Sequence, residues 1–290
     1  MNYEKTIKNI RTRMHGYLEY HKIKSVVLGV SGGMDSCLCA VLARPVCDSL
    51  GIPLIGRSLP IVTNKEDEIN RATYTGEIFC TEFRQENLGE IYNHLSLINP
   101  DPGIGYNSGE NIKQWKIRNG NIKARLRMIL LYNLASQTNG LVMSTDNYTE
   151  YLLGFWTLHG DVGDLAPIQQ LYKSEVYDIA EWIAYNEDWW EYPVGKKIIL
   201  DTIDALATDG LGVTDLGDLG QILPNWKGSS RDGYKEVDRI LKIWEGISEL
   251  DSESINLINE MRDHSIIQRH LKTEFKRNNP VIFERNSIIE

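Results

Sequence analysis

Hydrophobic residues in the first half of the chain alternate between helical spacing and short continuous runs. Apolar side chains recur every third or fourth position over residues 3–22, which predicts a helix, whereas residues 25–30 form the unbroken apolar run of a buried strand. The same patterns predict helices to about residue 50, over 66–80 and over 121–139, and strands over 52–60, 81–88 and 141–144. Strands that alternate with helices indicate parallel pairing, because parallel neighbours need a long crossover connection.

We therefore expect an α/β fold: a parallel twisted sheet with helices on both faces, Rossmann-like, which binds ligands at the carboxyl ends of its strands. Residues 99–120 and 205–233 are rich in glycine and turn residues, so both are predicted to be loops. Helical spacing from about Tyr234 predicts a helical C-terminal extension. The core then covers about residues 20–204, and the glycine-rich loop with the helical tail covers about 205–290.

Composition narrows the class of protein. The chain has 290 residues, enough for a single domain over residues 1–290, and 31 Lys and Arg against 40 Asp and Glu give a net charge of −9. This acidic balance opposes nucleic-acid binding, and no stretch approaches the roughly 18 apolar residues of a membrane span. Since residues 1–5 lack the apolar core of a signal peptide, we expect a cytoplasmic protein without a nucleic-acid or membrane partner.

The four cysteines lack the paired spacing of a zinc site. They are Cys37, Cys39, Cys47 and Cys80. A cytoplasmic protein keeps its thiols reduced. We interpret Cys37 and Cys39 as buried helix residues, with a catalytic thiol as the alternative.

The turn at residues 31–36, Ser-Gly-Gly-Met-Asp-Ser, connects the first predicted strand to the next helix. Backbone N–H groups at such a turn can bind a phosphate, and glycine lets the anion approach closely. The loop lacks the lysine of a Walker motif and carries Asp35 instead, so a divalent metal would have to neutralise a bound polyphosphate. The alternative is an ordinary Gly-Gly turn capped by Asp35 and Ser36.

Val30 to Ser36 after an apolar strand resembles the signature loop of the N-type ATP pyrophosphatases, the PP-loop enzymes of the adenine nucleotide alpha hydrolase-like fold. Further segments resemble the NAD synthetases in order and nearly in spacing. They are residues 121–128, 144–150, 154–161, 164–173 and 272–280. Together with the loop, these five separate matches are spread over most of residues 25–280, and their order is far more specific than the loop alone.

This resemblance implies a ligase that forms a C–N bond. The carboxylate of nicotinic acid adenine dinucleotide (deamido-NAD) would attack the α-phosphate of ATP, giving an acyl-adenylate and pyrophosphate, and ammonia would then displace AMP to form NAD. The family further implies Mg²⁺ as cofactor and a homodimer. Glutamine-using relatives place an amide-hydrolysing domain before this core, whereas here the loop begins at Ser31, so we expect the nitrogen to arrive as free ammonia or from a separate protein.

Site residues follow from the same resemblance. ATP contacts are implied for Gly29, Val30, Ser31, Gly32, Gly33, Met34, Asp35, Ser36, Thr145, Lys173 and Thr208. Magnesium ligation is implied for Asp35 and Glu150, and direct roles in catalysis for Asp35 and Lys173. Contacts to deamido-NAD are implied for Arg125, Asp164, Phe275 and Lys276. Arg127, two positions beyond Arg125 on the predicted helix, faces elsewhere and is interpreted as structural.

Three departures from the family pattern leave alternatives open. Leu158 stands where a basic residue is usual, Phe275 replaces a histidine, and residues 208–220 lack the common loop sequence. One alternative is another ATP pyrophosphatase that amidates or thiolates a different acceptor. The other is a nucleotide-binding homologue with impaired catalysis.

Overall fold

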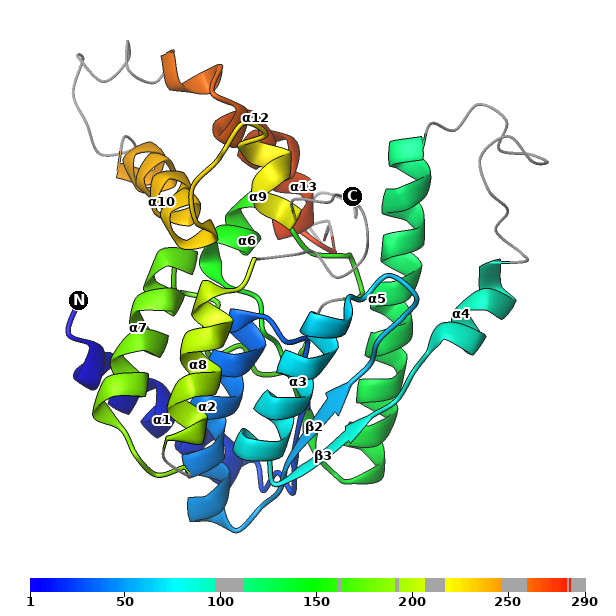
Figure 1. The fold of residues 1–290 in the computed structure, drawn as a ribbon, viewed down its shortest axis with the longest axis vertical. Helices are drawn as coiled ribbons and strands as arrows, with labels where there is room; N and C mark the ends of the chain where they lie inside the picture. The colour runs from blue at the N-terminus through cyan, green and yellow to red at the C-terminus, as the bar shows by residue number, and fades with distance from the viewer. Residues whose placement is uncertain are drawn as a thin grey trace, which may run out of the picture.

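Four parallel strands form a single sheet in the order β3–β2–β1–β4 (Figure 1). The computed structural model describes residues 1–96, 112–160, 163–190, 193–206, 217–246, 260–280 and 282. The strands are β1 (Val26–Gly29), β2 (Leu54–Ser58), β3 (Glu82–Gln85) and β4 (Leu141–Met143). Val26 of β1 pairs with Leu54 on one side and with Leu141 on the other. Because the strand order reverses between β1 and β4, the sheet has a switch point there, where α/β proteins bind ligands.

Helices cover both faces of the sheet, as the sequence predicts. In the first half of the chain they are α1 (Tyr3–Tyr20), α2 (Met34–Leu50), α3 (Glu66–Phe79), α4 (Gly89–Ser96) and α5 (Ile112–Gln137). In the second half they are α6 (Tyr148–Leu153), α7 (Lys173–Asn186), α8 (Val194–Asp204), α9 (Gly217–Ile222), α10 (Ser230–Gly246), α12 (Ser265–Lys272) and α13 (Glu274–Arg277). Helix α5 packs on β1 and β4, whereas α2 and α3 pack on the opposite face (Figure 1). Among the described residues, no helix is both long enough and apolar enough to cross a bilayer.

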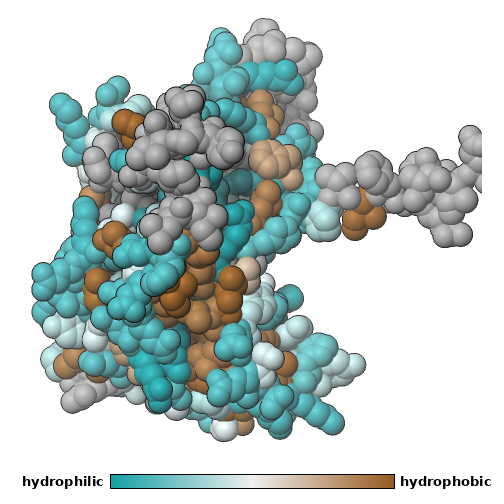
Figure 2. Space-filling view, turned by 90° about the vertical axis from the view of Figure 1, so that its right-hand side faces the viewer, coloured by the Kyte–Doolittle hydropathy of each residue, from teal (hydrophilic) through white to brown (hydrophobic). Residues whose placement is uncertain are grey.

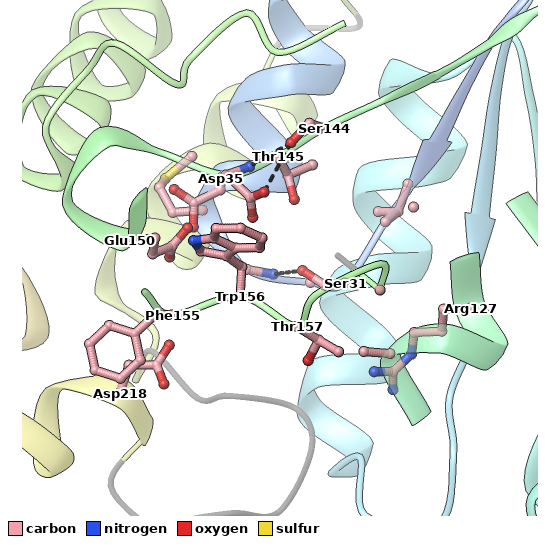
Figure 3. A pocket seen from close by; sticks show the side chains of 18 of the residues that line it. Ser31, Asp35, Arg127, Ser144, Thr145, Glu150, Phe155, Trp156, Thr157 and Asp218 are labelled. Carbon is pink, nitrogen blue, oxygen red and sulfur yellow. Dashed lines mark hydrogen bonds between the residues drawn. The ribbon is translucent and has the colours of Figure 1, made fainter. Parts of the chain in front are cut away.

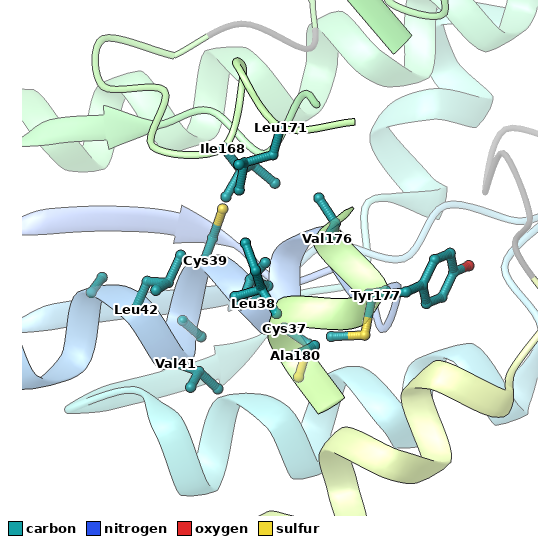
Figure 4. Packing of buried hydrophobic residues seen from close by; sticks show 14 of the residues in the cluster. Cys37, Leu38, Cys39, Val41, Leu42, Ile168, Leu171, Val176, Tyr177 and Ala180 are labelled. Carbon is teal, nitrogen blue, oxygen red and sulfur yellow. The ribbon is translucent and has the colours of Figure 1, made fainter. Parts of the chain in front are cut away.

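Helix α2 is buried on nearly every side, because α1, α3, α7 and α8 surround it. Figure 4 shows Cys37 and Leu38 of α2 close to Val176 and Ala180 of α7, whereas Cys39 points toward Ile168. All four cysteines are free and buried. Burial raises the pKa of the Cys37 thiol to about 12, so it stays protonated and unreactive. The interpretation of these residues as buried packing groups is confirmed.

Two predicted loops contain helix instead. Residues 112–120, predicted as part of a loop, form the first turns of α5, so the helix predicted over 121–139 begins at Ile112. Polar residues with Asn119 and Gly120 give this stretch low helix propensity and conceal its periodicity. The preceding residues 97–111 lie outside the described part of the chain.

The prediction for residues 205–233 is corrected in the same way. Residues 217–222 form α9, and α10 begins at Ser230 rather than at Tyr234. Tertiary packing outweighs the glycine content here, since Leu219 and Ile222 are buried in the core. Residues 207–216, which include Thr208, lie outside the described part of the chain.

Gly76 offers a test of how closely α3 packs on the sheet. A Cβ at this buried position would lie 2.0 Å from Cδ2 of Phe83 in β3. Gly76→Ala should therefore lower the free energy of unfolding by about 1–3 kcal/mol through overpacking. Gly16→Ala is the matched control, because a Cβ at this exposed position of α1 would have no neighbour within 4 Å. This variant should raise the free energy of unfolding by about 0.5–1 kcal/mol, since alanine favours a helix more than glycine does. Urea unfolding measures both, and equal stability of the two variants would contradict this packing.

Candidate active site

A cavity opens at the carboxyl ends of β1 and β4, at the switch point of the sheet. Its walls come from the 29–35 segment after β1, the 142–146 segment of β4 and its following turn, and the starts of α6 and α7. Figure 3 shows Asp35, Thr145 and Glu150 together on this wall. Helices α9, α10 and α12 contribute a further wall through Asp218, Tyr234 and Arg269. Two halves of the sequence therefore meet at one site.

The 31–36 loop has the geometry of an anion cradle. Gly32 has φ +82°, and a Cβ there would lie 2.2 Å from the Glu68 carbonyl oxygen, so only glycine fits. The Ser31 N–H donates to Ser36 Oγ (3.2 Å), and the Ser36 hydroxyl donates to the Gly33 carbonyl (3.0 Å). Gly33 caps α2 without a side-chain bond, so the positive end of the helix dipole faces the loop.

Three charged side chains meet beside this loop. The Lys173 ammonium forms ion pairs with Asp35 Oδ2 and, at 3.4 Å, with Glu150 Oε1. The Asn147 amide donates to Asp35 Oδ1 at 3.0 Å. Only 5% of the Lys173 side chain is exposed, whereas the exposed fractions of the Asp35 and Glu150 side chains are 16% and 15%. Each of the three groups comes from a different helix, namely α2, α6 and α7.

Burial and mutual charge set the pKa values of this cluster. Burial alone would lower the pKa of Lys173, but the carboxylates of Asp35 and Glu150 hold it well above its ordinary value. Burial raises the pKa of Glu150, with Lys173 acting against this shift and Asp35 adding to it. Lys173 is therefore a fixed positive charge at the loop.

Helix α6 positions Glu150 through its own N-terminus. The Asn147 side chain accepts from the Glu150 N–H (3.0 Å), and Glu150 Oε2 accepts from the Asn147 N–H (3.3 Å). This capping box satisfies two N–H groups that would otherwise lack partners. Because Asn147 also contacts Asp35, the same cap links α6 to the loop after β1.

The outer part of the cavity is aromatic and basic. The Arg269 guanidinium carbon lies 3.6 Å from the centroid of the Phe155 ring. Lys276 Nζ donates to the carbonyls of Gly154 (2.6 Å) and Trp156. Figure 3 shows Phe155 and Trp156 on the Glu150 side of the cavity. An aromatic ring with nearby cations suits a flat heterocycle that carries anionic groups.

Most of the predicted ATP contacts lie together in this cavity. Lining residues among them are Gly29, Val30, Ser31, Gly32, Gly33, Met34, Asp35, Thr145 and Lys173. Glu150 and Lys276 also line it, whereas Ser36 lies behind the loop and braces it. Thr208 cannot be placed, because it lies outside the described residues.

Three predicted dinucleotide contacts lie away from the cavity. Arg125 is exposed on α5 and donates twice to the Leu158 carbonyl, at 3.2 Å each. Asp164 accepts from the Val142 N–H (2.9 Å), which anchors the end of β4. Phe275 is 59% exposed. These positions do not meet in the cavity described above.

Sequence reasoning missed basic residues of the cavity wall. Arg71 lines the cavity and donates to the Gly32 carbonyl at 3.1 Å. Arg127 faces away from Arg125, as expected, and donates to the Leu59 carbonyl (2.9 Å), but it also lines the cavity. Arg269 reaches the site from α12, and no local pattern in the sequence marks it. The one available signal in the sequence is Leu158, which stands where the family usually has a basic residue. Its presence suggests that a cation from elsewhere in the chain replaces the missing charge.

The carboxylates of Asp35 and Glu150 suit a magnesium ion that is bound in part by the phosphates of a substrate. Among the described residues, no group of three or more His, Cys, Asp or Glu side chains is placed to hold a metal. Asp35 and Glu150 nevertheless converge on one cation, the Lys173 ammonium. Magnesium is usually bound by one or two carboxylates together with substrate phosphates and water, so this pair suffices.

Comparisons with known proteins agree with the fold. The family model described as NAD synthase matches residues 6–280. The NH(3)-dependent NAD(+) synthetase of Methanosarcina mazei is 32% identical over 270 residues, which span 90% of this chain and 91% of that protein.

Two solved structures share the fold over nearly the whole chain. The NMN synthetase of Francisella tularensis has a TM-score of 0.72 and 21% identity, covering 98% of this chain and 99% of that one. The NH3-dependent NAD synthetase of Campylobacter jejuni has a TM-score of 0.64 and 24% identity, covering 98% and 100%. At these identities, the likeness establishes the α/β fold alone.

Proposed function

The chain belongs to the NAD synthase family, and we propose that it amidates deamido-NAD to NAD with ammonia, at the expense of ATP. The observation that carries this proposal is one cavity that joins the 31–36 anion loop, the Lys173 charge cluster and an aromatic wall at Phe155 and Trp156. The first two suit a polyphosphate, and the third suits a pyridine ring.

The proposed chemistry has two steps. The nicotinate carboxylate attacks the α-phosphate of ATP, which forms an acyl-adenylate and releases pyrophosphate. Ammonia then attacks the acyl carbon, and AMP leaves as the C–N bond forms and ammonia loses a proton. Residues 31–36 and Lys173 would bind the phosphates, and Thr145, which lines the same cavity, would contact ATP. The protein thus acts by positioning the reactants and by stabilising phosphate charge.

We propose that Asp35 and Glu150 hold a magnesium ion against these phosphates. When bound, the ion supplies positive charge to the departing pyrophosphate. Lys173 would then be free to contact a phosphate oxygen.

The four reduced, buried cysteines favour the cytoplasm as the compartment in which the protein works.

We also propose a homodimer that forms through α5 and α4. Figure 2 shows hydrophobic residues gathered along the face of α5. Ile129 and Ile117 of α5 and Ile91 of α4 are 56%, 40% and 49% exposed, which suits contact with a second copy. Arg125 is exposed four positions before Ile129, on the same face of α5, so a second copy that packs there would lie beside it.

The reaction predicts its own stoichiometry. The protein with ATP, Mg²⁺, ammonium and deamido-NAD should produce NAD, AMP and pyrophosphate in equal amounts, measured by chromatography. ADP and phosphate as products would contradict the mechanism. A higher kcat/KM with nicotinic acid mononucleotide than with deamido-NAD would contradict the dinucleotide as the substrate.

Asp35→Asn should lower kcat by at least about 100-fold, because an amide is a poor magnesium ligand and a poor partner for Lys173. Asp48→Asn is the matched control, since Asp48 lies on the same helix and pairs at the surface with Arg44. The control should retain turnover. Full activity of Asp35→Asn would exclude the proposed metal and charge roles.

Ile129→Asp should convert the proposed dimer into a monomer, because a buried unpaired carboxylate would oppose association. Tyr74→Asp on α3, across the sheet, replaces another exposed apolar residue and should leave the mass unchanged. Analytical ultracentrifugation gives the masses. A monomeric unmodified protein at micromolar concentration would refute the dimer.

We assign Arg269 to a substrate phosphate. Its Nε donates to the Leu153 carbonyl and its Nη1 to Gln221, while Nη2 has no partner among the described residues and the side chain lines the cavity. Arg269→Gln should raise one KM about 10-fold, the loss of one charge-assisted hydrogen bond. A raised KM for deamido-NAD alone identifies the dinucleotide, and a raised KM for ATP alone identifies the triphosphate. With exposed Arg239→Gln as control, two unchanged KM values would reject the assignment.

A further inference from the structure

Helix α7 begins at Lys173, and Glu175 Oε2 of the same helix accepts from the Tyr172 N–H at 3.0 Å. Its N-cap residue, Tyr172, makes no capping bond through its side chain, although the first N–H groups of a helix need acceptors. Side chains from two other helices supply them. The Lys173 N–H donates to Thr149 Oγ1 of α6 (2.8 Å), and the Ser174 N–H donates to Asp238 Oδ2 of α10 (2.7 Å).

A third bond joins these two acceptors. The Thr149 hydroxyl donates to Asp238 Oδ1 at 2.5 Å. Thr149 is 0% exposed and Asp238 is 1% exposed, so water does not compete for these bonds. Burial raises the pKa of Asp238, whereas the bonds from Thr149 and Ser174 lower it. A carboxylate at the N-terminus of α7 is further favoured by the helix dipole.

The residues that Asp238 holds are direct neighbours of the charge cluster. Thr149 immediately precedes Glu150, and Ser174 immediately follows Lys173. We propose that Asp238 is a positioning residue: through Thr149 and Ser174 it fixes the relative placement of Glu150 and Lys173, and so the placement of both against Asp35. This inference rests on the proposed function, since it concerns the ATP side of that reaction.

A second carboxylate on the same face of α10 supports this role. Glu245, two helical turns beyond Asp238, accepts hydrogen bonds from the hydroxyls of Tyr148 (2.5 Å) and Tyr172. These tyrosines directly precede Thr149 and Lys173 in the chain. Helix α10 therefore holds the start of α6 and the start of α7 at two points each. Asp238 itself makes no contact with Lys173 or Glu150 among the bonds described, so its effect on them would pass through Thr149 and Ser174.

Asp238→Asn tests the proposal with little change of volume. The amide cannot accept from Thr149 and Ser174 together, so α6 and α7 lose their common anchor. We expect kcat to fall about 10- to 100-fold, as for other residues that orient a metal or phosphate site from behind. The KM for ATP should rise, while the KM for deamido-NAD should stay within twofold. Glu236→Gln on the same helix is the control, because Glu236 pairs with Arg239 at the surface, and it should match the unmodified protein.

A purely structural role predicts a different result. It would lower the melting temperature and the fraction of active enzyme, but kcat per active site and the KM for ATP would not change. Active sites are counted by the AMP released in a single turnover. An Asp238→Asn protein with unchanged kcat per active site and unchanged KM for ATP would overturn the proposal.

Thr149 supplies a second route to the same answer if Asp238→Asn fails to fold. Thr149→Val keeps the shape of the side chain but removes the hydroxyl, so it should reproduce the loss of kcat. Thr149→Ser keeps the hydroxyl, so it should retain most of the kcat of the unmodified protein. Where both single variants fold, the double variant should lose little more than either one, because both break the same linkage. Equal activity of the valine and serine variants, or additive losses, would contradict the linkage.

Binding measurements separate this proposal from the proposed function. If the unmodified protein forms no NAD, the proposed function fails, and calorimetric titration with ATP and Mg²⁺ still tests the placement. Asp238→Asn should then weaken ATP binding at least fivefold relative to Glu236→Gln. Equal affinities of these two variants would overturn the positioning role on their own.

Discussion

A buried lysine held between two partly buried carboxylates is the interaction on which the rest of this structure depends. Removing each ion from water costs several kcal/mol, and only close opposite charges and hydrogen bonds offset that cost. Lys173 meets this condition through Asp35 and Glu150, and Asn147 supplies a further bond to Asp35. Because the three charges belong to α2, α6 and α7, those helices must start at the same point in space. The reversal of strand order between β1 and β4 brings them there.

The same cluster explains how an acidic chain can hold a polyphosphate. A net charge of −9 would repel such a ligand if the charge were spread evenly. The cations are instead concentrated where the ligand would lie: Lys173 at the loop, Arg71 against the Gly32 carbonyl and Arg269 at the outer wall. The N-terminus of α2 adds its dipole at the same place. Local placement therefore outweighs overall charge, and the remaining surface is free to be acidic.

The parts of the fold that the sequence predicted are those with strong local signals. The apolar run of β1 and the Ser31–Ser36 turn after it specify a strand, a loop and a helix without help from distant residues. Where the signal is tertiary, prediction failed: α9 contains two glycines but forms because Leu219 and Ile222 are buried. The site divides in the same way. Motifs marked Asp35, Glu150 and Lys173, which the structure brings together, whereas Arg269 and Asp238 form hydrogen bonds with residues more than 60 positions away, and no spacing rule reveals such contacts.

Leu158 and Phe275, the two side chains that depart from the family pattern, both lie away from the charge cluster. Leu158 offers its backbone carbonyl to Arg125, so this position still organises a basic residue although its own charge is absent. Phe275 points outward on α13, while the next residue, Lys276, donates to the Gly154 carbonyl inside the cavity. Both substitutions therefore spare the wall that faces the charge cluster. A change that abolished phosphate chemistry would have to alter the 31–36 loop, Glu150 or Lys173, and none of these departs from the pattern. The departures bear on how the second nucleotide would be held, whereas Arg269 is a cation of the cavity wall that the pattern did not lead us to expect.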